Sequence, residues 1–168
     1  MITPPHPLDE RHRLESFTCR EPALTDWLHE HARANQAADS ARTYVITAGD
    51  DLVIGYYCLS GFSVVRARAT SRLSSNQPDP LPGVLIGRLA VDRRFEGLGV
   101  GESLVSDALA RAATAAETIG MRAIFVDALH EDAARYWQRH GFRPLRDDPL
   151  TLYMRMDDVR ATIASPGS

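Results

Sequence analysis

Lysine is absent from this 168-residue chain, so all 19 basic residues other than histidine are arginines. The absence excludes a nucleotide-binding P-loop, whose Gly-Lys-Ser/Thr signature requires a lysine. The 22 acidic residues leave a formal net charge of −3, whereas nucleic-acid-binding domains are usually basic. Arginine nevertheless suits phosphate recognition through its rigid donor fork, so composition alone leaves nucleic-acid binding open.

Cysteines and long apolar segments are also scarce. Cys19 and Cys58 have neither metal-ligand nor redox spacing, so we expect two free thiols, no metal site and a cytoplasmic protein. No apolar run approaches the roughly eighteen residues that span a membrane. Residues 1–10 lack the apolar core of a signal peptide. Chain length predicts one domain over residues 1–168.

The hydrophobic pattern predicts a mixed α and β chain. Residues 66–83 are expected to form a loop, and the tail after Asp157 is expected to be frayed. A hairpin is expected across the turn at residues 49–51, and the order of elements excludes a helical bundle or a β-sandwich. The pattern predicts helices at 21–40, 97–118 and 131–140, and strands at 43–48, 52–65, 84–91, 122–129, 142–145 and 151–156.

A first motif joins the predicted strand 84–91 to the helix after it. Gly97 and Gly99 lack the Cβ atoms that would keep a ligand from the backbone. The free N–H groups and the dipole of a helix start favour an anion, so the motif predicts a pyrophosphate cradle, with a charge-assisted contact from Arg94. A dinucleotide fingerprint is excluded because Glu102 stands where its third glycine belongs. The simpler alternative is a glycine-rich helix start packed closely on a sheet.

A second motif, Ala133 to Phe142, follows the predicted strand 122–129. It reads as a short helix that stops at Gly141 before another strand begins. Taken alone, Tyr136 and Trp137 of this helix are more simply explained as aromatic residues of the core.

Together, the two motifs resemble those of the GNAT superfamily of N-acetyltransferases. Arg94, Gly97 and Gly99 match its cofactor motif, and Ala133, Tyr136, Gly141 and Phe142 match its later motif. The resemblance implies an α/β (α+β) fold with flanking helices and a mixed twisted sheet, splayed between the fourth and fifth strands around acetyl-CoA. It implies backbone contacts to the cofactor from Leu89, Ala90, Val91, Leu98, Gly99, Val100, Gly101 and Glu102. His130 stands where many members carry an asparagine near the cofactor. The resemblance also implies a core at about 14–159 with flexible ends.

Further segments are similar to one branch, the acetyltransferase toxins of bacterial type II toxin–antitoxin pairs. They include Phe17-Thr18-Cys19, residues 87–92 and residues 148–153. The resemblance implies acetylation of the α-amino group of aminoacyl-tRNA, which blocks translation. It also implies a homodimer and a ribbon-helix-helix antitoxin encoded by an adjacent gene. A GNAT enzyme acting on a small amine or a protein N-terminus, and a non-catalytic acetyl-CoA-binding module, stay open. The candidate RNA contacts are Arg88, Arg93, Arg66, Arg68 and Arg72.

Trp137 stands where the family usually has the tyrosine that acts as general acid or orients the cofactor sulfur. An indole N–H donates a hydrogen bond but does not titrate usefully. Three interpretations remain: Trp137 positions the sulfur, Tyr136 has taken over the role, or the enzyme is slow or inactive. We favour positioning by Trp137, and we therefore expect Trp137 to point toward the cofactor and Tyr136 to face the core.

Overall fold

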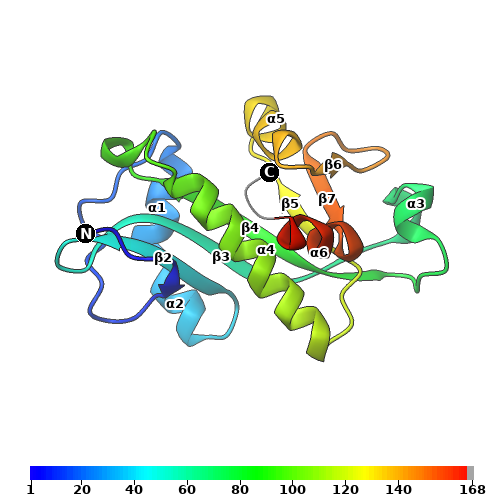
Figure 1. The fold of residues 1–168 in the computed structure, drawn as a ribbon, viewed down its shortest axis with the longest axis horizontal. Helices are drawn as coiled ribbons and strands as arrows, with labels where there is room; N and C mark the ends of the chain where they lie inside the picture. Colours follow the sequence, from blue (N-terminus) through cyan, green and yellow to red (C-terminus); the bar gives the residue numbers. More distant parts are fainter. Residues whose placement is uncertain (166–168) are drawn as a thin grey trace. The chain divides into compact units, whose positions relative to one another are not determined.

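The computed structural model describes residues 1–165 and divides them into two compact units. The first unit contains Met1–Ser60 and Gly87–Ala108, and the second contains Gly61–Ile86 and the chain from Leu109 onward. Figure 1 labels strands β3 (Leu52–Val64) and β4 (Leu81–Val91) and helix α4 (Val100–Thr118). Each of these three elements contributes residues to both units. The prediction of a single domain stays a prediction.

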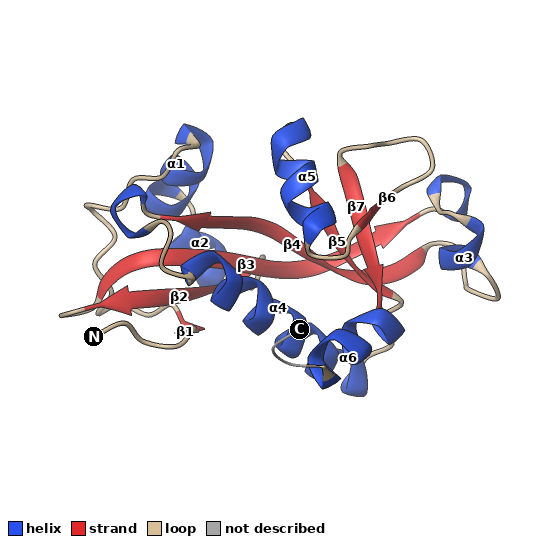
Figure 2. Cartoon of the chain, turned by 45° about the horizontal axis from the view of Figure 1, so that its top comes forward, coloured by secondary structure: helices blue, strands red, loops and turns tan. Residues whose placement is uncertain are grey.

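Seven strands form one sheet in the order β1-β2-β3-β4-β5-β7-β6 (Figure 2). The β4–β5 pair is parallel and runs from Gly83 to Ile86, while β4 itself continues to Val91. The recorded pairs β1–β2, β2–β3, β5–β7 and β6–β7 are antiparallel, which confirms the predicted mixed sheet and the hairpin. The remaining strands are β1 (His6–Pro7), β2 (Arg42–Ala48), β5 (Ala123–Asp127), β6 (Arg143–Pro144) and β7 (Thr151–Arg155).

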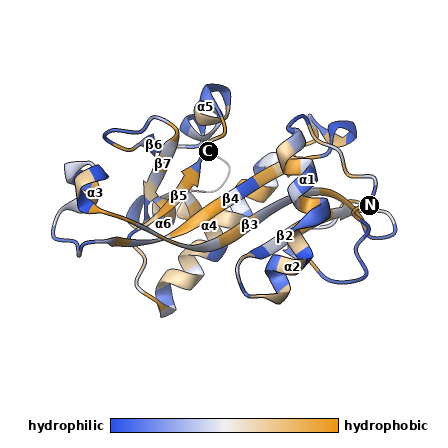
Figure 3. Ribbon diagram, turned by 180° about the vertical axis from the view of Figure 1, so that it is seen from behind, coloured by the Kyte–Doolittle hydropathy of each residue, from blue (hydrophilic) through white to orange (hydrophobic). Residues whose placement is uncertain are grey.

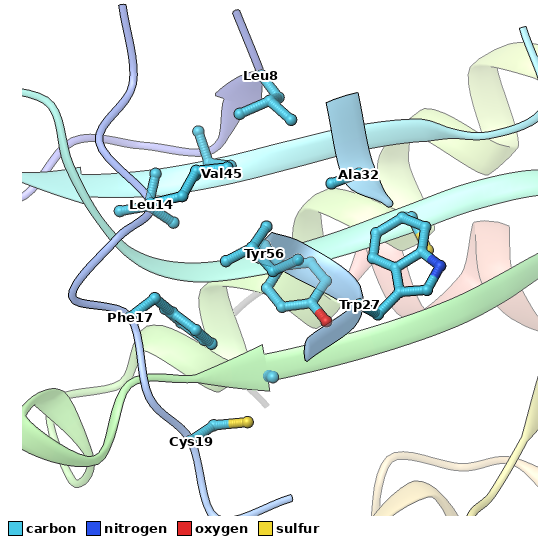
Figure 4. Close-up of a cluster of buried hydrophobic side chains, with 12 residues drawn as sticks. Leu8, Leu14, Phe17, Cys19, Trp27, Ala32, Val45 and Tyr56 are labelled. Atoms are coloured by element: carbon cyan, nitrogen blue, oxygen red, sulfur yellow. The ribbon is translucent and has the colours of Figure 1, made fainter. Parts of the chain in front are cut away.

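In the first unit, two helices replace the single helix expected at residues 21–40. Helix α1 (Pro22–Glu30) ends at His31, whose φ of −125° leaves the helical range, and α2 (Ala32–Ala37) begins directly afterwards. The break places Ala32, which is fully buried, in an apolar cluster with Trp27 and Tyr56 (Figure 4). Burial of an apolar face outweighs the preference for one continuous helix.

The N-terminal segment of the first unit is held by two histidines. The Nε2 atoms of His6 and His12 lie 2.9 Å apart, and the side chain of His12 is fully buried. The backbone N–H of Asp9 donates to His12 Nδ1, so His12 donates from Nε2, and His6 Nδ1 donates to the carbonyl of Pro4. Burial lowers the pKa of His12, although the charge of Asp9 opposes the shift. These hydrogen bonds therefore hold residues 4–12 of the segment to one another.

In the second unit, the expectation of a loop over residues 66–83 is wrong in part. This region forms a 3-10 turn at Arg66–Arg68 and helix α3 (Ser71–Ser74), and β4 begins at Leu81. The guanidinium of Arg122 donates to the carbonyls of Arg72 and Leu73. Leu73 itself is fully buried. These are long-range contacts, and the local polar composition carried no sign of them.

The tail after Asp157 was expected to be frayed, and this expectation is wrong. Helix α6 (Met156–Ala164) buries Met156 and Val159, and Asp157 and Asp158 occupy its first turn, where the helix dipole favours acidic groups. The tail's last residues, 166–168, lie outside the described part of the chain.

Helix α5 (Glu131–Arg139) agrees with its prediction, and β5 is coloured hydrophobic in Figure 3. Within residues 1–165, no helix is both long and apolar enough to cross a membrane.

Candidate functional site

The glycine loop (residues 96–99) joins a 3-10 turn at Arg93–Phe95 to α4. Gly97 and Gly99 have φ values of +77° and +81°, which an L side chain adopts only with strain. A Cβ added at either glycine would meet no atom within 4 Å. The glycines therefore permit a turn that faces open space, which argues against the alternative in which they allow close packing. Because both glycines leave the helical range, α4 begins at Val100 rather than at the expected Gly97.

Close packing in this region comes instead from Gly55 of β3. A Cβ there would lie 2.8 Å from Cγ1 of Val100 and 3.2 Å from Cδ1 of Leu104. Gly55 therefore lets the first turn of α4 approach the strand closely. Residue patterns did not single out Gly55, because nothing local shows which helix lies over it.

The first turn of α4 offers backbone donors to an anion. The first four N–H groups of a helix have no acceptor within the helix, and the dipole is positive at this end. In α4 the bond from Ser103 N to Gly99 O, at 3.1 Å, opens the helical series. Leu98 and Gly99 are exposed, Gly101 is half-buried, and the Glu102 carboxylate is exposed. This geometry fits a diphosphate held by backbone N–H groups.

Arg94 was expected to contact a phosphate, but the structure places its fork on Asp92. Arg94 Nε and Nη2 each lie 3.0 Å from a carboxylate oxygen of Asp92, and Nη2 lies 3.3 Å from the carbonyl of Ser16. The backbone N–H groups of Arg94 and Thr18 also donate to Asp92, whose exposure is only 1%. Burial would raise the pKa of Asp92, but these hydrogen bonds outweigh it and hold the pKa below its ordinary value.

Asp92 is a residue that sequence reasoning missed. A signal for it existed, because an aspartate directly after a strand and two residues before an arginine is a common cap of a short turn. Its carboxylate ties the start of the turn to the segment around Thr18, and its own N–H donates to the carbonyl of Ile54. Arg20 and Glu96 add an exposed ion pair at the glycine loop. The loop conformation is thus supported from two sides within the first unit.

The last residues of β4 alternate in burial. Ala90 is buried, whereas Leu89 and Val91 are half-buried. Arg88 is also half-buried, and its Cζ lies 4.5 Å from the centre of the Trp27 ring. Arg93 is exposed, and its backbone N–H donates to the carbonyl of Thr18.

The aromatic pair of α5 differs from expectation. Trp137 is the buried ring, with 6% exposure, and it packs edge-on against Phe142 at 5.2 Å between centroids. Tyr136 is half-buried and contacts Trp137 and His140. The expectation that Tyr136 is the core-facing ring is therefore wrong, because the helix turns Trp137 inward. The expectation that Trp137 points toward the cofactor stays a prediction.

His130 serves as the N-cap of α5. Its Nδ1 accepts a hydrogen bond of 3.2 Å from the N–H of Ala133, and the residue has extended backbone angles. An asparagine would cap a helix in the same way. The family resemblance implies a position near the cofactor for His130, and the structure shows a capping role for its side chain.

The candidate RNA contacts of the second unit are largely engaged within it. Arg68 pairs with Asp148 at 3.2 Å, and Arg66 donates to the carbonyl of Gln77 at 2.7 Å. Arg72 is exposed. Over residues 1–165, no three His, Cys, Asp or Glu side chains are grouped to hold a metal ion. Cys19 and Cys58 are free and buried, as expected.

Comparison with known proteins decides the family. The profile described as Acetyltransferase (GNAT) family matches residues 9–142. The chain belongs to the GNAT acetyltransferase family. It is therefore an N-acetyltransferase that uses acetyl-CoA, and the predictions of fold, enzyme class and cofactor are confirmed.

Two similar proteins, one of them in two solved structures, place this GNAT enzyme more narrowly. A tRNA-acetylating toxin of Mycobacterium tuberculosis is 41% identical over 159 residues, which cover 95% of each chain. The solved structure of AtaT complexed with acetyl-methionyl-tRNAfMet has a TM-score of 0.87 at 28% identity, covering 96% of this chain and 98% of AtaT. An AtaT variant bound to the C-terminus of the antitoxin AtaR and acetyl-CoA has a TM-score of 0.84 at 28% identity, covering 98% and 99%.

Proposed function

We propose that this protein is a toxin that acetylates the α-amino group of aminoacyl-tRNA and thereby blocks translation. The observation that carries the proposal is the 41% identity, over 95% of both chains, to a tRNA-acetylating toxin. The similarity to AtaT in its complex with acetyl-methionyl-tRNA supports the same substrate class. The open glycine loop supports the use of acetyl-CoA, because its positive φ values and exposed backbone suit a diphosphate.

Within this proposal, the first unit holds the cofactor. When bound, acetyl-CoA supplies an acetyl group activated as a thioester. The N–H groups of residues 98–102 hold its diphosphate, with Gly97 completing the turn, and the backbone of Leu89, Ala90 and Val91 aligns its pantetheine arm. Arg94 supports the loop through Asp92 rather than contacting the phosphates with its fork. His130 caps α5 through Nδ1, and its contact to the cofactor stays a proposal.

The chemistry places modest demands on side chains. An α-amine has a pKa of roughly 8, and esterification of its carboxyl group lowers that value, so a neutral nucleophile exists without a strong base. Positioning is therefore the main contribution of the protein. We propose that Trp137, which stands where the family has its positioning tyrosine, is the residue of α5 on which turnover depends, and that Tyr136 supports the fold of α5. Trp137 is buried and packs edge-on against Phe142, so its ring is held in one orientation.

The partners follow from the same assignment. We propose that a ribbon-helix-helix antitoxin encoded by an adjacent gene binds this toxin, since an AtaT variant is seen with the C-terminus of AtaR. We also propose a homodimer that acts in the cytoplasm, where charged tRNA is used. Co-expression with the adjacent gene product is expected to restore growth and to yield a stable complex on gel filtration.

The deciding experiment is transfer of radiolabelled acetyl groups from acetyl-CoA by the purified protein. Charged tRNA is expected to become labelled and to release labelled N-acetyl-amino acid on mild alkaline hydrolysis, whereas uncharged tRNA stays unlabelled. A small amine and a peptide with a free N-terminus are tested in parallel. Labelling of the small amine or of the peptide, with charged tRNA left unlabelled, would overturn the proposal in favour of a different GNAT activity. Absence of labelling in all arms would indicate an inactive cofactor-binding protein.

A further inference from the structure

Arg88 lies in β4 one residue before the strand segment 89–91, and it differs from the other arginines of the first unit. Its guanidinium carbon is 4.5 Å from the centre of the Trp27 indole ring. Its side chain is also within hydrogen-bonding reach of the Cys58 thiol. Arg88 is half-buried, so the Trp27 ring and the Cys58 thiol, rather than bulk water, surround much of its charge.

The Trp27 ring that faces Arg88 stacks on the ring of Tyr56. The rings of Trp27 and Tyr56 are nearly parallel, with an interplanar angle of 9° and a centroid distance of 6.0 Å. Tyr56 is fully buried, and its hydroxyl donates to the carbonyl of Leu24 at 2.6 Å. Figure 4 shows the Trp27 and Tyr56 rings side by side within the apolar cluster. A guanidinium stacked on an indole keeps its N–H donors in the plane of the fork and available at its edges.

The charge of Arg88 has no counter-charge within the described part of the chain. Arg94 pairs with Asp92 and Arg20 with Glu96, but no carboxylate of residues 1–165 pairs with Arg88. The Cys58 thiol does not supply one, because burial raises its pKa even though Arg88 opposes the shift. A partly buried cation without an anion is costly, and the cost falls when an anion binds.

We propose that Arg88 positions the acceptor by binding a phosphate group near the 3′ end of the aminoacyl-tRNA. This inference rests on the proposed function and adds a recognition residue to it. An arginine fork matches a phosphate with two parallel hydrogen bonds. Acetyl-CoA also carries phosphates, but the backbone N–H groups proposed to hold them belong to the glycine loop and α4, which follow Val91. Three extended residues, about 10 Å of strand, separate Arg88 from Val91 at the end of β4, so Arg88 is not placed among those donors.

The test compares Arg88→Gln with the unaltered enzyme in steady-state acetylation of charged tRNA. Glutamine keeps a polar group of similar reach but removes the charge and the fork. We expect the KM for charged tRNA to rise about tenfold, in line with the loss of one charge-assisted contact. The plot of log affinity against log salt concentration is expected to become shallower, its slope decreasing in magnitude by about 0.7, because each neutralised phosphate of a single strand contributes about that much. The KM for acetyl-CoA and the melting temperature are expected to stay unchanged.

Two further variants sharpen the test. Arg88→Lys keeps the charge but lacks the planar fork, so it should retain the salt slope while raising the KM for charged tRNA less than Arg88→Gln does. Arg42→Gln is the matched control, because Arg42 is an exposed arginine of the first unit whose partner is Asp39. It should leave the KM values and the salt slope unchanged.

The possible results separate the explanations. An increase in the KM for acetyl-CoA instead of charged tRNA would overturn the inference and assign Arg88 to the cofactor phosphates. A lower melting temperature with an unchanged salt slope would also overturn it, since that result is expected of a purely structural residue. If the unaltered enzyme acetylates no charged tRNA, the proposed function itself fails. If it does so and Arg88→Gln behaves identically, only the role of Arg88 fails.

Discussion

The glycine loop lies between strand β4 and helix α4, and helix α5 likewise follows a strand, β5. The two regions use their residues differently. In the glycine loop, the backbone carries the geometry, and Gly97, Leu98 and Gly99 are exposed. In α5, side chains carry it, because Trp137 is buried against Phe142 and His130 caps the helix. Substitutions in the loop should therefore change ligand binding, whereas substitutions in α5 should change packing and orientation.

Gly99→Asp is expected to have the largest effect. The backbone at φ +81° costs a side chain about 1–2 kcal/mol, and the new carboxylate repels a diphosphate. We expect affinity for acetyl-CoA, measured by calorimetry, to fall about 100-fold. Gly49→Asp is the matched control, since Gly49 also has a positive φ of +60° and open space around it, but lies in the β2–β3 turn. If Gly99→Asp binds acetyl-CoA normally, the glycine loop is not the diphosphate site.

Asp92→Asn tests whether the loop depends on the buried carboxylate. The amide would turn a donor toward the N–H groups of Arg94 and Thr18, so we expect a loss of about 2 kcal/mol in the free energy of unfolding by urea. The pKa of Asp92 is lowered in the folded protein, so this contribution is present above the ordinary value of 3.8 and is lost as the pH falls through the folded pKa. Glu96→Gln, in the exposed pair with Arg20, should cause no measurable change. Equal effects of the two substitutions would contradict this account.

The aromatic pair separates positioning from acid catalysis. Tyr136→Phe removes one hydroxyl from a half-buried ring, and we expect kcat to change less than about threefold because general acid catalysis is not required of it. Trp137→Tyr restores a titratable donor with a pKa of about 10 and should keep or raise kcat. A decrease of about 100-fold in Tyr136→Phe, with Trp137→Tyr unaffected, would show instead that Tyr136 is the general acid. Circular dichroism of both variants controls for loss of the fold.

His130→Ala should have the smallest effect and should act on stability alone. Removal of an N-cap side chain costs about 1 kcal/mol, and His130→Asn should recover that loss because asparagine is a favoured cap. Thermal unfolding measures both variants. An unchanged melting temperature in His130→Ala, combined with a weaker affinity for acetyl-CoA, would indicate that His130 contacts the cofactor rather than serving as a cap.

Much of the site could be predicted from local sequence. The spacing of Gly97 and Gly99 after a strand predicted a turn whose backbone is open to a ligand, because glycine lacks a Cβ and adopts positive φ values without strain. The start of α5 at Glu131 and its end before Gly141 were also predicted from the local sequence. The local sequence carries a signal for Asp92 as the cap of a short turn, but not for its contacts to Thr18 and Ile54, which lie far from it in the chain.

The orientation of the aromatic pair could not be predicted in the same way. Neighbouring residues on a helix point about 100° apart, so the sequence indicates that Tyr136 and Trp137 face different directions but not which one faces inward. The packing of Trp137 on Phe142 decides it. The tail was misjudged for a similar reason, since the apolar residues of α6 become a helix face only when a sheet is present to cover it.

By itself, the sequence determined the mixed fold, the hairpin, the glycine loop and the family, because these depend on periodicity, glycine conformation and motif spacing. Only the tertiary structure decided that Arg94 is committed to Asp92, that Trp137 is the buried ring, and that Arg88 rests on Trp27 without a carboxylate partner. The physical reason is that charge pairing and burial depend on residues brought together by folding, whereas backbone conformation depends mainly on each residue and its neighbours.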